Sequence, residues 1–169
     1  MTDVHNPKDV EDRLWKEIER GRYGMLGLVG VEHPQHFQPM TPFPEPENGQ
    51  IWFFTRDDTD LAKAVAAGGG GHAMLTISSK DQDVKACLGG TLSLSQDRTR
   101  IDKFWNTVVA AWYPDGKDDP RLTLLRMDLD SATVWLSEAG PVRFAVEIAR
   151  ANLTGRQPDL GGRANVQFN

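Results

Sequence analysis

The chain has 169 residues, a length that fits one domain with a sizeable core. Hydrophobic residues make up 39% and charged residues 25%, and the net charge of −5 argues against nucleic acids or an anionic membrane as partners. The single cysteine, Cys87, excludes an internal disulfide and a cysteine-based zinc cluster, and no apolar run approaches the roughly 20 residues needed to cross a bilayer. No signal-peptide pattern is visible, so we expect a cytoplasmic location.

The first predicted element, within residues 1–21, is a helix that begins at Pro7, with Asn6 as its N-terminal cap and Gly21 as its stop. Apolar residues at every fourth position give this helix a stripe for burial: Val10, Leu14 and Ile18. Residues 23–31, rich in methionine, leucine and valine, predict a buried strand.

The next segments alternate between extended and helical patterns. Residues 37–41 predict a short extended segment, because two prolines disfavour helix in the residue before each of them. A loop over 42–49 closes with Asn-Gly, a typical hairpin-turn pair, and aromatic and β-branched residues over 50–55 predict a strand. A helix over 57–67, capped by one of the two aspartates at its start, ends in four glycines, each of which costs about 1 kcal/mol relative to alanine inside a helix.

Residues 72–78 and 84–94 predict two antiparallel strands joined by a short charged turn. Gly89 and Gly90 inside the second strand indicate a bulge or the close approach of another backbone. This hairpin order breaks the regular strand–helix alternation that a parallel, doubly wound sheet would need.

Asp97 predicts the cap of a third helix, which apolar residues at helical spacing extend to Trp112: Ile101, Phe104, Trp105, Val108, Val109 and Trp112. On one continuous helix, Trp105 and Trp112 share a face, and packing in the core or in a dimer interface is the favoured interpretation. A direct contact of Trp112 with a ligand ring is the alternative. Residues 113–120 predict an ordered loop.

Two further strands are predicted at 122–128 and 133–137. Residues 142–152 fit a strand or a helix, and their apolar spacing favours the helix. The tail over 154–169 is expected to pack loosely or to reach a partner. The pattern predicts one domain over 1–169 that is mainly β with peripheral helices (β+α), with about six antiparallel strands in a barrel.

The segments on either side of the first loop form the candidate ligand site. Gln38-Pro39-Met40-Thr41 lies on one predicted strand and residues 52–56 on the next, and Thr59 and Lys63 follow on a helix. Such a corner can offer backbone amides, hydroxyl groups and an ammonium group to one phosphate, while an apolar strand lies beside a flat ring. The sequence therefore makes flavin mononucleotide (FMN) the first ligand to test.

Other kinds of site have little support. His33 and His36 lie three residues apart, but in an extended segment with no acidic or cysteine ligand at a known spacing, so we expect no metal. The sequence contains no Gly-x-Ser-x-Gly elbow and no Gly-x-Gly-x-x-Gly fingerprint. Cys87 is interpreted as a small buried hydrophobe. No side chain stands out as a general acid or base, so no catalytic residue is assigned.

Four stretches form a recognisable set: 38–41, 49–55 with Lys63 downstream, 101–120, and 124–127 with 132–135. With these motifs the chain resembles the general stress protein family within the pyridoxamine 5′-phosphate oxidase-like, FMN-binding split-barrel superfamily. The third stretch is the most specific, because it combines two tryptophans, a Pro-Asp-Gly turn and a double aspartate. The resemblance covers roughly residues 10–155.

The resemblance implies a homodimer of antiparallel split β-barrels with two FMN sites at the subunit interface. The cofactor-binding residues that it implies are Gln38, Pro39, Met40, Thr41, Phe54, Thr55, Arg56, Thr59, Lys63 and Trp135. The first four would run beside the isoalloxazine ring, the next three would lie near the ring and the ribityl phosphate, and Thr59 and Lys63 would hold the phosphate. Trp135 would approach the ring from the other subunit.

Two departures from the family pattern bear on function. Gln38 stands where the family usually has an arginine, which removes a positive charge and predicts weaker FMN binding. The arginine-rich substrate motif of true pyridoxamine phosphate oxidases is missing, so that activity is not expected. We expect a flavin-dependent oxidoreductase of the general stress protein type. The alternatives are a non-catalytic flavin-binding or flavin-sequestering stress protein, and a related barrel that uses FAD or a deazaflavin.

Overall fold

The computed structural model describes residues 6–21, 23–30, 36–68, 70–137, 141–157 and 161–168. Within these residues, eight strands form one antiparallel sheet in the order β2-β1-β5-β6-β7-β4-β3, with β8 paired to β7. The strands are β1 (Gly24–Leu28), β2 (Gln38–Met40), β3 (Phe43–Glu45), β4 (Gln50–Arg56), β5 (Gly71–Ser78), β6 (Val84–Ser95), β7 (Leu122–Ser137) and β8 (Gly161–Gln167). The helices are α1 (Pro7–Arg20), α2 (Asp60–Gly68), α3 (Arg98–Phe104), α4 (Thr107–Ala110) and α5 (Pro141–Thr154), with short 3₁₀ turns η1 (Pro46–Asn48) and η2 (Gly116–Asp118).

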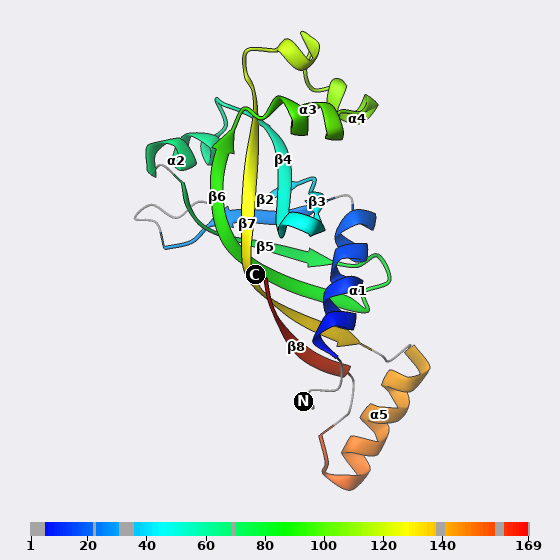
Figure 1. Cartoon of the computed structure of the whole chain (residues 1–169). Coiled ribbons are helices and arrows are strands. Elements are labelled where there is room, and N and C mark those ends of the chain that lie inside the picture. The colour runs from blue at the N-terminus through cyan, green and yellow to red at the C-terminus, as the bar shows by residue number, and fades with distance from the viewer. Residues whose placement is uncertain are drawn as a thin grey trace.

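The long strands β6 and β7 determine the shape of the sheet, and Figure 1 shows both of them bending through the middle of the molecule. One edge of β7 pairs with β6 along most of its length. Its other edge pairs first with β4 and then, in its second half, with β8. The sheet therefore curls and divides, as predicted for an antiparallel split barrel with peripheral helices.

The core consists of two apolar clusters on opposite faces of β4. Ile51 and Phe53 belong to the first cluster, which also contains the buried stripe of α1. Trp52 belongs to the second cluster, and Phe54 packs against it together with side chains of α3 and its neighbours. Because side chains alternate along a strand, β4 connects the barrel core to the layer formed by α3 and α4.

Several predicted ends and turns are confirmed. The Asn6 side chain accepts a hydrogen bond from the Lys8 amide, and Gly21 ends α1. Gly49 has a φ of 61°, a left-handed conformation that favours glycine, and it closes the β3–β4 hairpin. The register between β6 and β7 shifts at Gly90, where a Cβ atom would lie 2.3 Å from the carbonyl oxygen of Asp128.

The start of α2 differs from the prediction, which placed the cap at Asp57 or Asp58. The hydroxyl of Thr59 accepts a hydrogen bond from the Ala62 amide at 3.3 Å, so Thr59 caps the helix. The Asp58 carboxylate instead binds the guanidinium group of Arg56.

The predicted continuous helix up to Trp112 is wrong. It breaks at Trp105, whose backbone is extended (φ −62°, ψ 130°), and Asn106 then begins α4 by accepting hydrogen bonds from the Val108 and Val109 amides. Trp105 and Trp112 therefore do not share a helix face. Trp105 packs against the second cluster, whereas Trp112 is 74% exposed.

The C-terminal half of the chain forms more strand than expected. The two strands predicted at 122–128 and 133–137 are one, since β7 runs without interruption. The favoured helix over 142–152 is confirmed as α5, which Figure 1 shows standing off the sheet. The prediction of a loosely packed tail is wrong, because β8 pairs with β7 and its alternate side chains are buried in the core. With β3, which forms inside the predicted loop, this gives eight strands rather than about six.

Candidate functional site

A cavity of about 1100 Å³ lies between the C-terminal end of α1, the strand β2, the C-terminal end of β4 and the α4 region. Eight of the ten predicted cofactor-binding residues line it: Gln38, Pro39, Met40, Thr41, Phe54, Thr55, Arg56 and Thr59. Strand β2 reaches this wall through its pairing with β1, and β4 reaches it at the point where the sheet passes into α2. The fold thus brings together two segments that the sequence indicated separately.

Lys63 and Trp135 do not occur among the described residues of the cavity wall. Lys63 is exposed on α2, one turn after Thr59, whose carbonyl accepts its amide hydrogen bond. Trp135 is half-exposed on β7, opposite Lys85 of β6. The roles of Lys63 at a phosphate and of Trp135 at a partner's ligand stay predictions.

Two threonine hydroxyl groups meet where β4 ends and α2 begins. The oxygen atoms Oγ1 of Thr55 and Thr59 lie 3.1 Å apart, and the Thr59 hydroxyl donates to the Arg56 carbonyl at 3.0 Å. Thr59 also caps α2, so the positive end of this helix faces the same corner. The Thr59 proton is taken by the Arg56 carbonyl, so the corner offers the Thr55 hydroxyl and helix-end amides to an anionic group.

Arg56 is a cation at this corner, and a carboxylate already holds it. Its Nε donates to Oδ1 of Asp58 at 3.0 Å and its Nη2 donates to the second carboxylate oxygen. This hydrogen bonding raises the pKa of Arg56 and lowers the pKa of Asp58. An anion bound at the corner would have to share the guanidinium group with Asp58.

Tyr113 is hydrogen-bonded to the strand that carries this corner. Its hydroxyl donates a hydrogen bond to the Thr55 carbonyl at 2.8 Å, and burial, with a smaller contribution from Asp119, raises its pKa to about 12. The phenol is therefore neutral at physiological pH. Its ring packs near Trp105 and Phe54, and Phe54 packs edge-on against Phe43, so one wall of the cavity is aromatic.

The remaining lining residues were not assigned from the sequence. They come from the end of α1, from β3 and from the α4 region: Glu19, Arg20, Gly21, Phe43, Asn106, Thr107, Val108, Val109, Trp112 and Tyr113. The long motif over 101–120 was the available indication for the last six, and contact of Trp112 with a ligand had been the alternative interpretation. No sequence pattern predicted that the end of α1 would line this cavity.

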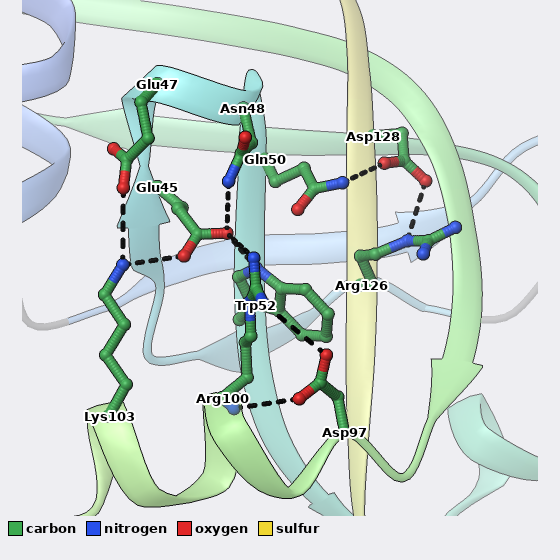
Figure 2. Close-up of polar contacts among 10 residues, drawn as sticks. All are labelled: Glu45, Glu47, Asn48, Gln50, Trp52, Asp97, Arg100, Lys103, Arg126 and Asp128. Atoms are coloured by element: carbon green, nitrogen blue, oxygen red, sulfur yellow. Dashed lines mark hydrogen bonds and ion pairs between the residues drawn. The ribbon is translucent and has the colours of Figure 1, made fainter.

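A buried carboxylate, that of Glu45, fastens the β3–β4 hairpin to α3, as Figure 2 shows. The side chain of Glu45 is 3% exposed. Burial raises its pKa, but hydrogen bonds from its partners outweigh this and lower the pKa to about 2. The four donors are Lys103 Nζ (2.6 Å), Asn48 Nδ2 (2.9 Å), Arg100 Nη2 (3.1 Å) and Trp52 Nε1 (3.3 Å). Glu45 thereby holds the helix that leads into α4.

Neither a metal site nor a membrane span is found in the described part of the chain. No group of three or more histidine, cysteine, aspartate or glutamate side chains there could hold a metal ion, and no described helix is long and apolar enough to cross a bilayer. His33 lies outside the described residues. Cys87, predicted to be buried, is only partly so; its Sγ lies 3.7 Å from the Sδ of Met74, and burial raises the pKa of the thiol.

Residues 9–159 match the family described as Pyridoxamine 5′-phosphate oxidase like. The fold is similar to that of a protein described as a general stress protein 26 from Jannaschia sp. CCS1, with 40% identity and a TM-score of 0.77 over 95% of this chain and 99% of the other. It is also similar to a general stress FMN/FAD binding protein from Xanthomonas citri, with 41% identity and a TM-score of 0.71 over 79% of this chain and 92% of the other.

A more distant relative is the protein bli-3 of Neurospora crassa, which is 24% identical over 118 residues. The match includes 65% of this chain but only 56% of the relative, so the chain spans little more than half the length of that protein.

Proposed function

Because the chain belongs to the pyridoxamine 5′-phosphate oxidase-like family, we propose that it binds FMN, or FAD, in the cavity between α1, β2, β4 and α4. The observation that carries the proposal is that eight residues predicted for this ligand line one cavity. The volume of about 1100 Å³ is sufficient for a tricyclic ring with its ribityl phosphate. The relative from Xanthomonas citri, described as FMN/FAD binding, supports the same ligand class.

The phosphate would lie at the start of α2. The Thr55 hydroxyl and the amides of the first helical turn would suit a dianion, and the Thr59 hydroxyl, 3.1 Å from that of Thr55, would join them by turning from the Arg56 carbonyl. Arg56 would add charge there in competition with Asp58. Lys63, exposed one turn further along α2, would complete the phosphate site with a flexible ammonium group.

The flavin ring would lie along β2. Residues 38–41 give this wall a backbone edge and the polar amide of Gln38, while Phe54 and Phe43 supply apolar surface. Within the part of the chain that the structure describes, the Gln38 amide makes a 3.5 Å contact with the Sδ of Met40, so it can turn to the polar edge of a ring. The neutral amide would bind FMN more weakly than a charged donor in its place.

A bound flavin would supply electron or hydride transfer, so we further propose that the protein is an oxidoreductase. The chain's own part is to place the ring and exclude water from it. Tyr113, with a pKa of about 12 and its proton donated to a carbonyl, stays neutral and does not serve as an acid. If the protein binds FMN yet neither NADH nor NADPH reduces it and no reduced donor is oxidised, a flavin-sequestering role replaces catalysis.

We also propose that the protein is a homodimer whose second subunit closes this cavity. Val108 and Trp112 line the cavity and are 71% and 74% exposed, which is unusual for large apolar side chains. Met25 and Trp135 add further exposed apolar surface on the sheet. A cytoplasmic location and the lack of a nucleic-acid partner stay predictions.

The test of the ligand is a fluorescence titration of the flavin-free protein with FMN, compared with Lys63→Ala. Loss of one charged contact with the phosphate predicts weaker binding by about 1–3 kcal/mol. Lys80→Ala, at the exposed β5–β6 turn, is the matched control and should bind as the wild type does. Equal affinity of all three proteins would remove Lys63 from the site, and no FMN binding by the wild type would end the proposal.

A further inference from the structure

The charged side chains in the wall of the cavity differ in how closely they are paired with opposite charges. Three charged side chains line its described part: Glu19, Arg20 and Arg56. Arg56 is bound through two donors to Asp58. Arg20, by contrast, makes a 3.7 Å ion pair with Glu17 one turn earlier, and its side chain is 78% exposed. Arg20 is therefore the more available of the two cations.

The path of the chain places Arg20 at the β2 end of the cavity. Arg20 is the last residue of α1, and Gly21, with an extended backbone (φ −69°, ψ 140°), turns the chain toward β1. Strand β1 pairs with β2 so that Leu26 lies opposite Gln38. Arg20, Gly21 and Gln38 all line the cavity. The α1 end and β2 thus line the same cavity, in which Gln38 is neutral.

We propose that Arg20 is the positively charged contact for the reduced flavin ring, an inference that rests on the flavin site proposed above. Oxidised FMN takes up two electrons and one proton to give the reduced ring as an anion, whereas the oxidised ring is neutral. A cation beside the ring therefore stabilises the reduced form more than the oxidised form. Arg20 sets this preference, and its neighbour Glu19 opposes it.

The preference is measured as the ratio of two dissociation constants, for oxidised FMN and for FMN reduced by excess dithionite, which donates the electrons under anaerobic conditions. We expect Arg20→Gln to lower the preference for reduced FMN about fivefold, the size of one solvent-exposed charge interaction. The same change appears as a lower midpoint potential, since a tenfold ratio corresponds to about 30 mV for a two-electron couple.

Four further variants separate a charge effect from a structural effect. Glu19→Gln removes the opposite charge from the same wall and should raise the preference. Lys16→Gln, exposed one turn earlier on α1 and not among the described lining residues, should leave it unchanged. Arg20→Lys keeps the charge and should keep the preference. Adding Gln38→Arg to Arg20→Gln should restore it, because both side chains line the same cavity.

The outcomes distinguish this inference from the function on which it rests. If wild type and Arg20→Gln bind both forms of FMN with the same ratio, Arg20 has no such role and the flavin site stands. If Glu19→Gln and Arg20→Gln change the ratio in the same direction, the effect is not one of charge and the inference fails. If the wild type binds neither form, the proposed function itself fails.

Discussion

Glu45 carries a buried negative charge that makes the fold sensitive to acid. Burial raises its pKa, but hydrogen bonds from Lys103, Asn48 and Arg100 lower it from 4.5 to about 2. Because the pKa in the folded state lies below that of the unfolded chain, the carboxylate contributes stability above about pH 4.5 and loses it as the pH falls toward 2. The difference corresponds to about 3 kcal/mol.

We therefore expect Glu45→Gln to lower the free energy of unfolding at pH 7 by about 3 kcal/mol, since two cations then face a neutral amide. Urea unfolding between pH 7 and pH 3 should show less acid dependence in the variant than in the wild type. Glu47→Gln is the control, because this carboxylate is exposed and binds Lys103 at 3.4 Å, and it should cost less than about 1 kcal/mol. Identical pH profiles for wild type and Glu45→Gln would contradict the assignment.

Tyr113→Phe tests the hydrogen bond behind the cavity wall. Without the hydroxyl, the Thr55 carbonyl loses a buried donor at 2.8 Å, so stability should fall by about 1–3 kcal/mol. FMN affinity should fall as well, because Thr55 lines the cavity. Thermal unfolding and FMN titration measure the two effects. Tyr23→Phe, at an exposed tyrosine, should change neither; a Tyr113→Phe protein that behaves like it would show that the bond is dispensable.

Residue types and their spacing predicted the β2 and β4 sides of the cavity. This was possible because Gln38–Thr41 and Phe54–Thr59 lie next to local signals in the sequence, a turn and the start of a helix. They did not predict Arg20, because its place in the wall depends on how α1 turns into β1. Nor did they predict Glu45, since its four partners come from the hairpin and from α3, more than 50 residues later. Contacts of this kind become visible only in the folded chain.

At the scale of elements, α4 is a single turn whose position depends on its cap. The Asn106 side chain accepts hydrogen bonds from the Val108 and Val109 amides at 2.9 and 3.0 Å. We expect Asn106→Ala to cost about 1 kcal/mol of stability and to weaken FMN binding, because the α4 region lines the cavity.

Asp97→Ala is the matched control for Asn106→Ala. It removes the corresponding cap of α3, which contributes no described residue to the cavity wall. Its cost in stability should be similar, with a smaller effect on FMN titration. Equal losses of affinity in both variants would mean that α4 has no specific part in binding.

Two elements that sequence patterns misjudged have different physical causes. The apolar spacing continues through Trp105, but the Asn106 side chain competes for helix amides and restarts the helix. The tail over 154–169 carries few large apolar residues, yet β8 is held by backbone pairing with β7 and by small buried side chains such as Ala164 and Val166. Pairing with a distant strand overrides weak local preference.

At the scale of the whole molecule, the curled sheet and the family were both predicted correctly, and the assembly has still to be tested. The described surface leaves Trp112, Val108 and Trp135 exposed, and the first two lie in the wall of the cavity. A second subunit would cover such surface and complete the ligand site. The proposed flavin site and the proposed dimer therefore depend on one another.

Native mass spectrometry of the protein after addition of FMN tests both at once. We predict a dimer of the 18.8 kDa chain that carries two FMN molecules, one for each cavity. A monomer that retains a full share of FMN would contradict the shared site, and a protein that binds no flavin in any state of assembly would contradict the account as a whole.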